Sequence, residues 1–324
     1  MRVFVTGGAG YIGSVCVEQL LAQGDDVVVF DNLSEGHRAA VDPKATFIEG
    51  DLNDLASISL ALKQFAPAAV LHLAANALVA ESMTNPGKYF HNNVSGGLNL
   101  LRSMVECGVK RIVFSSTCAT FGTPERVPID EQTPQNPINP YGESKLIFEK
   151  ILHWFNRIHE LTFVTLRYFN VAGASEKYGE DHKTETHLIP RILQVALGQS
   201  EHAEIFGTDF DTPDGTCVRD YIHVRDIASA HLLALSAHES DSFNLGTGRG
   251  TSIREVLDAC RSVSGHPIPV VEKPRRAGDP ARLVASSAKA KRKLDWKPEI
   301  EDIHKIVETA WSWRLAHPSG YSES

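Results

Sequence analysis

Short apolar runs alternate with longer stretches of helical periodicity through the first half of the chain. The apolar runs that we predict as strands are residues 2–6, 26–31, 45–51, 68–74, 111–116 and 161–169. The amphipathic stretches that we predict as helices between them are residues 11–24, 55–65, 92–108 and 141–160. Continuous apolar strands joined by crossover helices predict a parallel sheet covered on both faces, which is the doubly wound α/β architecture.

The pattern changes after residue 170, where a polar segment with two glycines covers residues 173–186. Helices and short isolated strands follow this segment, which predicts a smaller C-terminal α+β lobe. We expect a first domain over residues 1–170, rejoined by about residues 221–248, and a second domain over residues 171–324.

Three glycines separate the first predicted strand from the first predicted helix. Gly7, Gly10 and Gly13 have the spacing G-x-x-G-x-x-G. Such a loop allows a turn without Cβ hindrance, a close approach of the backbone to a pyrophosphate, and tight helix packing. The strand before it and the amphipathic helix after it are the context that a Rossmann-type dinucleotide site requires.

The second predicted strand ends in an acid, Asp31. A carboxylate at this place accepts hydrogen bonds from an adenosine ribose and repels a 2′-phosphate, so we predict NAD in preference to NADP. Arg38 and His37 stand nearby and offer positive charge to a phosphate, which leaves NADP as the alternative. An aspartate that only caps a turn is the weaker explanation beside the glycines.

Tyr141 and Lys145 share one face of the predicted helix 141–160 because they stand four residues apart. A free tyrosine has a pKa of about 10 and is a poor base at neutral pH unless positive charge stabilises its phenolate. The Lys145 ammonium and a nicotinamide ring both supply such charge, so Tyr141 is a candidate general base. In isolation this pair is more simply a surface pair, and the glycine loop is what favours catalysis.

Thr117 follows the fifth predicted strand, at the carboxyl edge where ligands bind in doubly wound sheets. Its hydroxyl is expected to bridge Tyr141 and a reacting substrate oxygen. Ser115 and Ser116 are expected to satisfy local backbone groups, and Cys118 to pack as a small side chain. A nucleophilic serine or cysteine is a poorer interpretation, since no histidine stands in a recognisable elbow or pair motif.

Composition and charge exclude several classes of partner. The net charge of -8 is spread along 324 residues, which argues against a nucleic-acid partner. Five widely spaced cysteines contain no Cys-x-x-Cys pair, so we expect reduced thiols in the cytoplasm. We expect neither a leader nor a membrane-spanning segment, because no long apolar stretch is present. His182, His187 and Asp181 do not have a known ligand spacing, so no metal is expected.

Ordered motifs along essentially the whole chain resemble the extended short-chain dehydrogenase/reductase family, and within it the nucleotide-sugar 4-epimerases. They are VTGGAGYIGS, DNLSEGH, GDLND, HLAA, NNVSGG, FSST, YGESK, RYFNVAGA, THLIP, DGTCVRDYIHVRD, NLGTG, RRAGDPARLVASS and HPSGY. The resemblance implies an isomerase of galactose metabolism that interconverts UDP-glucose and UDP-galactose through a transient 4-keto sugar. It further implies tightly bound NAD, a homodimer, and a first domain for NAD with a second for the nucleotide sugar.

The family's contacts, transferred residue by residue, define a predicted site. The catalytic residues are Tyr141, Lys145 and Thr117. The cofactor residues are Gly7, Gly10, Tyr11, Ile12, Gly13, Asp31, Asn32, Leu33, Ser34, Gly36, Asp51, Leu52, Leu73, Ala74, Ala75, Asn92, Lys145 and Phe169. The substrate residues are Thr117, Tyr141, Asn170, His187, Leu188, Ile205, Phe206, Arg219, Arg276 and Leu283.

Some of these positions depart from the family pattern or have another explanation. Ala77 stands where other members carry a lysine, and His187 where some carry asparagine. Guanidinium groups at Arg219 and Arg276 suit a diphosphate because each binds two oxygens at once. Salt bridges to Asp220 and Asp279 are the alternative role for these arginines.

The residues after Thr117 separate possible activities. Sugar dehydratases of the family carry an acid pair there, whereas this chain has Cys118 and Ala119, which leaves alcohol oxidation and its reversal. The resemblance implies that Leu283 flanks the sugar, where its intermediate size favours a hexose and leaves UDP-N-acetylhexosamine, UDP-pentose and UDP-uronate epimerases open. A nucleotide-sugar reductase or dehydrogenase and an NAD-binding sensor without turnover are the further alternatives.

Overall fold

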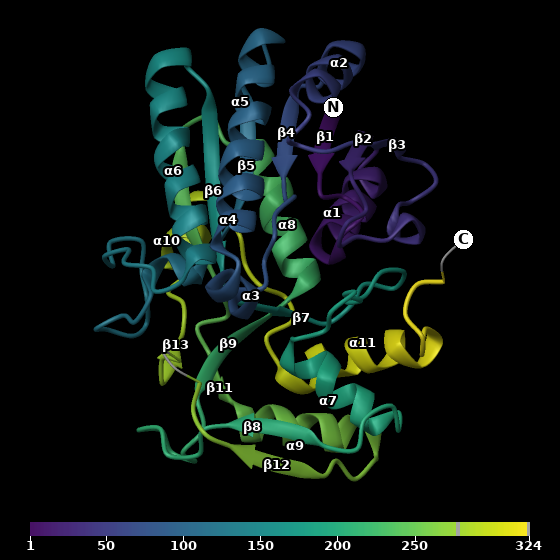
Figure 1. Ribbon diagram of the computed structural model, residues 1–324, viewed down its shortest axis with the longest axis vertical. Helices are drawn as coiled ribbons and strands as arrows, with labels where there is room; N and C mark the ends of the chain where they lie inside the picture. The colour runs from purple at the N-terminus through teal and green to yellow at the C-terminus, as the bar shows by residue number, and fades with distance from the viewer. Residues whose placement is uncertain (277–278, 323–324) are drawn as a thin grey trace.

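The computed structural model describes residues 1–276 and 279–322. Residues 277–278 of the motif RRAGDPARLVASS and residues 323–324 of the predicted second domain lie outside this described part. A larger layered region is built around one sheet, and a smaller region follows at the carboxyl ends of its strands (Figure 1).

Among the described residues, seven parallel strands form the large sheet in the order β10-β6-β5-β4-β1-β2-β3. These strands are β1 (Arg2–Thr6), β2 (Asp26–Asp31), β3 (Thr46–Glu49), β4 (Ala69–His72), β5 (Arg111–Thr117), β6 (Thr162–Tyr168) and β10 (Asp241–Leu245). Val3 and Val5 of β1 enter one apolar core while Phe4 enters the other, as the two-residue period of a strand requires. All six strands predicted in the first half are present, and the doubly wound fold is confirmed.

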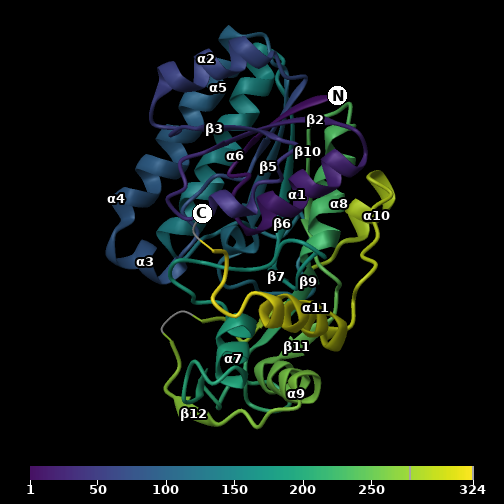
Figure 2. The ribbon, with the colours of Figure 1, turned by 90° about the vertical axis from the view of Figure 1, so that its right-hand side faces the viewer.

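Helices cover both faces of this sheet, which explains why its strands are apolar throughout (Figure 2). Helices α1 (Tyr11–Ala22) and α8 (Val224–Leu235) pack together on one face. Helices α2 (Leu55–Phe65), α5 (Gly97–Glu106) and α6 (Pro140–His159) pack on the other.

The helix predicted over residues 92–108 is a composite. The short helix α4 (Pro86–Tyr89) runs into a π-helical segment, η2 (Phe90–Gly96), which continues as α5. Asn93 in the π-helical segment accepts a hydrogen bond from the Asn76 N–H at 2.9 Å and donates one to the Asn76 carbonyl at 3.0 Å. The helix therefore starts earlier than predicted, and its widened turn binds the loop after β4.

The smaller region holds two further sheets and their helices. A four-stranded sheet consists of β7 (Asn170–Ala172), β9 (Val218–His223), β11 (Gly250–Ser252) and β13 (Arg282–Leu283). A two-stranded sheet consists of β8 (Ala203–Phe206) and β12 (Val270–Lys273). The remaining helical elements of the described chain are η1 (Arg38–Ala40), α3 (Val79–Thr84), η3 (Cys118–Phe121), α7 (Leu188–Ala196), α9 (Ile253–Ser264), α10 (Ala288–Lys293) and α11 (Ile303–Ala316). The core of the smaller region lies among α7, α9 and α11.

Strand β10 and helix α8 come from the second half of the sequence but belong to the layers of the large sheet. Strand β10 pairs in parallel with β6, and α8 packs against α1. The chain therefore enters the smaller region at β7, returns to the large region at α8 and β10, and enters the smaller region again at β11. The limits of the two domains stay a prediction.

Candidate active site

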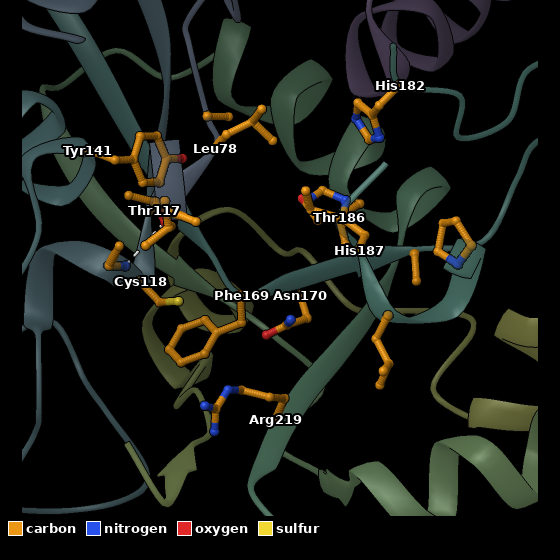
Figure 3. A pocket seen from close by; sticks show the side chains of 18 of the residues that line it. Leu78, Thr117, Cys118, Tyr141, Phe169, Asn170, His182, Thr186, His187 and Arg219 are labelled. Carbon is orange, nitrogen blue, oxygen red and sulfur yellow. Dashed lines mark hydrogen bonds between the residues drawn. The ribbon is translucent and has the colours of Figure 1, made fainter. Parts of the chain in front are cut away.

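A cavity of about 920 Å³ lies between the carboxyl ends of the large sheet's strands and the smaller region. The glycine loop and the start of α6 line it from the large region, and β7, α7 and β8 line it from the smaller one. Figure 3 shows Tyr141 and Thr117 on one side, His182 and His187 on another, and Arg219 at a third. This is the edge at which doubly wound sheets bind ligands.

Tyr141 lies in the first turn of α6, whose N-terminus is set by Asn139 and Pro140. The Asn139 carboxamide accepts the Gly142 N–H at 2.8 Å, and Pro140 occupies a position that needs no N–H partner. Lys145 follows one turn later and donates from Nζ to the Ser115 carbonyl at 2.8 Å. The helix start thus directs the phenol and the ammonium toward the end of β5.

Burial is the main influence on both titrating groups. It raises the pKa of Tyr141 to about 12, although a hydrogen bond with Thr117 opposes the rise. It lowers the pKa of Lys145 to about 7, although the negative charge of Glu149 opposes the fall. Tyr141 therefore keeps its proton at neutral pH unless further positive charge, such as that of a nicotinamide ring, stabilises its phenolate.

The serines of β5 differ from the prediction, because both bond to distant side chains. Ser115 Oγ lies 2.8 Å from His231 Nε2, and Ser116 Oγ donates to Glu149 Oε1 at 2.5 Å. Strand β5 lies in the middle of a sheet, so its backbone groups already have partners in the ladder. Cys118 packs beside an apolar cluster, and burial raises the pKa of its thiol to about 11.

Sequence reasoning missed the buried ion pair behind this strand. Arg167 of β6 donates to Glu149 of α6 from Nη2 at 2.6 Å and from Nε at 3.0 Å. Gln135 donates to the same carboxylate at 3.1 Å. The signals for such a pair were an acid within the apolar face of the predicted helix 141–160 and Arg167 within the predicted apolar strand 161–169.

The glycine loop has the geometry that a dinucleotide needs. Gly7 has a φ of +75°, and a Cβ there would lie 2.4 Å from the Ala74 nitrogen. A Cβ on Gly13 would lie 2.1 Å from the Gly7 carbonyl oxygen. Helix α1 has Gly10 as its N-cap without a side-chain cap and no acid in its first turn. Its first N–H groups are therefore available to a pyrophosphate, and the loop fits NAD.

Asp31 ends β2 and lines a second, smaller cavity. It accepts the Ala9 N–H at 3.0 Å and the Leu33 N–H at 2.8 Å, and both bonds oppose the rise in its pKa that burial causes. The smaller cavity continues from the glycine loop past Asp31 and Asn92. The carboxylate thus reaches the space where a ribose would lie.

Most of the predicted cofactor residues line the two cavities, and two of them lie outside these linings. Those that line the two cavities are Gly7, Gly10, Tyr11, Ile12, Gly13, Asp31, Asn32, Ser34, Gly36, Leu52, Leu73, Ala74, Ala75, Asn92, Lys145 and Phe169. In the described part of the chain, Leu33 and Asp51 do not line either cavity. Leu33 packs against the core beside α1, and Asp51 accepts hydrogen bonds from Asn32 and Asn53. Ala77 and the unpredicted Asn76 also line the main cavity.

The predicted substrate residues surround the main cavity, with one exception. Those that line it are Thr117, Tyr141, Asn170, His187, Leu188, Phe206, Arg219, Arg276 and Leu283. The side chain of Ile205 instead packs in the core of the smaller region, because successive residues of β8 point to opposite faces.

The two arginines predicted for the substrate site are held differently. Arg219 donates from Nη2 to Asp279 at 2.7 Å and from Nη1 to the Pro280 carbonyl at 2.9 Å, so the predicted alternative of a salt bridge with Asp279 is present. The Arg276 guanidinium lies 3.8 Å from the centre of the Phe206 ring. Asp220 takes no part, because its carboxylate accepts hydrogen bonds from Thr247 and neighbouring backbone groups.

Comparison with known proteins places the chain in a family. The model of the NAD dependent epimerase/dehydratase family matches residues 3–246. The chain belongs to this family. Among its relatives, the UDP-glucose 4-epimerase of Lacticaseibacillus casei is 53% identical over 329 residues, covering 100% of this chain and 99% of the relative. The resemblance inferred from the motifs is confirmed.

Solved structures in the family agree with the fold described above. The UDP-glucose 4-epimerase of Brucella ovis in complex with NAD is 46% identical, with a TM-score of 0.94 over 96% of this chain and 98% of that one. The enzyme of Bifidobacterium longum in complex with NAD+ and UDP is 38% identical, with a TM-score of 0.95 over 99% of this chain and 100% of that one.

Proposed function

We propose that this chain is an NAD-dependent isomerase that interconverts UDP-glucose and UDP-galactose through a transient 4-keto sugar. The observation that carries the proposal is the composition of one cavity wall. Tyr141 and Thr117 line it together with Cys118 and Ala119, so the residues after the threonine offer no acid for dehydration. Two UDP-glucose 4-epimerases that are 53% identical to this chain support the same activity, since the similarity covers 100% of this chain and 99% of each relative.

Tyr141 takes the proton of the sugar 4-hydroxyl in one direction and returns it in the other. Thr117 orients that hydroxyl, and Lys145 stabilises the phenolate through its positive charge. Glu149 in turn favours the charged form of Lys145. Bound NAD supplies a reversible two-electron oxidant at carbon 4. Because the return step restores both groups, no second substrate is needed.

The rest of the cavity would hold the nucleotide and admit the sugar. Arg276 and Arg219 would bind the diphosphate, and Asn170, His187 and Leu188 line the same cavity, with Phe206 beside Arg276. Leu283 and Cys118 pack against the apolar cluster that contains Phe169, at the proposed sugar end of the cavity. Leucine fills this wall more than a small residue would, which favours a hexose over an N-acetylhexosamine.

The deciding experiment incubates the purified protein, without added cofactor, with UDP-galactose, UDP-N-acetylgalactosamine and UDP-arabinose in turn. We expect UDP-glucose from the first, with no net change in nicotinamide absorbance, because the oxidant is regenerated in each turnover. Chromatography with mass spectrometry and NMR identifies each product. Failure to form a product from all three sugars would contradict the proposal. A net absorbance change with added NAD or NADH would indicate a dehydrogenase or reductase.

We further propose a homodimer formed through α5 and α6. Trp154 and Ile158 of α6 are 58% and 65% exposed, and Leu98 of the adjacent α5 is 36% exposed. Exposed apolar side chains on two neighbouring helices of one face of the sheet support a subunit interface there.

Trp154→Asp is expected to convert the dimer to a monomer, because it places a charge within that face. Analytical ultracentrifugation would measure the change. Leu233→Asp is the matched control, since Leu233 is 41% exposed on α8 at the other face of the sheet. A wild-type protein that sediments as a monomer, or a Trp154→Asp dimer of unchanged stability, would refute the interface.

We also propose that the protein acts in the cytoplasm. All five cysteines, each within the described chain, are free thiols, which supports a reducing compartment. Among the described helices, none has the length and apolar character to span a bilayer.

A further inference from the structure

Four metal-binding side chains converge at one side of the cavity. They come from the segment EDHKTETH, residues 180–187, which leads into α7. One ligand atom from each of Glu180, His182, Glu185 and His187 lies within 4.8 Å of the ligand atoms of the other three. Figure 3 shows the two imidazoles next to each other beside Thr186.

The two histidines present the same ring nitrogen to the carboxylates. His182 Nδ1 lies 3.2 Å from Glu185 Oε2 and 3.7 Å from Glu180 Oε1, and His187 Nδ1 hydrogen-bonds to that same Glu180 oxygen. The other oxygen of Glu185 accepts the His187 N–H at 2.8 Å, which holds that carboxylate in place. The side chains of Glu180 and Glu185 are 6% and 8% exposed.

Asp181 is not part of the cluster, although the sequence places it beside His182. Its carboxylate accepts the Tyr321 N–H at 2.9 Å and lies 3.4 Å from Arg314 Nη1. Arg314 also donates to the Glu180 carbonyl at 2.6 Å. The C-terminal helix therefore turns Asp181 away and leaves Glu180 facing the histidines.

We propose that Glu180, His182, Glu185 and His187 form a binding site for one divalent transition-metal ion of the zinc type. Two imidazole nitrogens and two carboxylate oxygens are a donor set for zinc and its neighbours, whereas calcium and magnesium prefer oxygen alone. In a tetrahedral site with bonds of about 2.0 to 2.1 Å, ligand atoms lie roughly 3.3 to 3.4 Å apart. Binding replaces the hydrogen bonds between these nitrogens and the carboxylates: the Nδ1 protons are released to solvent, and side-chain adjustments of about 1 Å complete the geometry.

The site would tie together elements that the sequence separates. The His182 ring packs edge-on against the Tyr11 ring, 6.3 Å away, and Tyr11 donates to the Gly173 carbonyl at 2.6 Å. Tyr11 opens α1, whereas His187 immediately precedes α7. A bound ion neutralises the two carboxylates and fixes the segment that carries His187 and Leu188 to the cavity, which goes beyond the proposed function and does not depend on it.

The test titrates chelator-treated, full-length protein with Zn²⁺ at pH 8 by isothermal calorimetry, and with Co²⁺ by visible absorption. We expect one equivalent of Zn²⁺, an increase in thermal stability on binding, and the absorption of four-coordinate cobalt. His182→Gln and Glu185→Gln are each expected to weaken Zn²⁺ binding by about tenfold or more. His238→Gln is the control, because His238 is an exposed imidazole outside the cluster.

Three results would overturn the proposal. One is the absence of stoichiometric Zn²⁺ binding and of the cobalt absorption in the unaltered protein, which needs no variant. Another is Zn²⁺ binding that the two ligand variants leave unchanged, which would place the ion elsewhere. The third is equal affinity for Mg²⁺, which the nitrogen ligands do not favour. These readouts are independent of turnover, so they also separate this proposal from failure of the epimerase assignment.

Discussion

Tyr141→Phe is expected to lower turnover of UDP-galactose by about 10²- to 10⁴-fold, which is the range that general acid–base groups contribute. The substitution removes only the hydroxyl that exchanges a proton with the sugar. The ring keeps its packing, including the edge-on contact with Tyr89 at 6.5 Å. Bound NAD and thermal stability should therefore stay near those of the unaltered protein.

The comparison needs a second tyrosine that is buried but does not line the cavity. Tyr178→Phe meets this condition, because Tyr178 is 7% exposed and its hydroxyl lies 3.5 Å from Asp42. Its turnover should remain close to that of the unaltered protein. Initial rates at saturating substrate, with NAD content measured on the same samples, give the result. A Tyr141→Phe protein within about tenfold of normal turnover would remove this residue as the general base.

Glu149→Gln is expected to lower the free energy of unfolding by about 3 to 5 kcal/mol, because it leaves the charge of Arg167 buried without a counter-ion. The side chains of Glu149 and Arg167 are 4% and 6% exposed. Glutamine has nearly the same shape as glutamate, so a cavity contributes little. The variant also loses the charge that opposes the fall in the pKa of Lys145, so turnover should decrease as well.

Two further proteins isolate the cause of this loss. Glu308→Gln removes one partner of an exposed pair with Lys305 and should change stability by less than about 0.5 kcal/mol. Glu149→Leu combined with Arg167→Met removes both charges and should be more stable than Glu149→Gln alone. Urea unfolding at one fixed NAD concentration measures all three. A Glu149→Gln protein within about 1 kcal/mol of normal stability would refute the explanation.

The elements that could be predicted are those with local signals. Helix α2 begins and ends at the predicted residues, because Asp54 accepts the N–H groups of Ala56 and Ser57 at its start and Ala66 adopts a left-handed conformation at its end. The composite helix around Asn93 could not be predicted, since a contact with the loop after β4 accompanies its π-helical turn.

The candidate site could be predicted in part for a topological reason. Thr117 ends β5, the glycine loop follows β1, and Tyr141 begins a helix that leads into β6. The carboxyl ends of parallel strands meet at one edge, so these residues had to come close together once the sheet was recognised. Only the structure decided that Arg219 pairs with Asp279, 60 residues away, and not with the adjacent Asp220.

The sequence by itself determined the doubly wound sheet, the dinucleotide loop, and the tyrosine, lysine and threonine of the proposed reaction, because each depends on local periodicity or on spacing along the chain. Only the tertiary structure decided that Glu149 faces Arg167, that Ile205 turns into a core, and that Glu180 joins two histidines while Asp181 turns toward Arg314. The physical reason is the same in each case. The direction of a side chain within a strand, helix or loop is fixed by partners that lie far away in sequence.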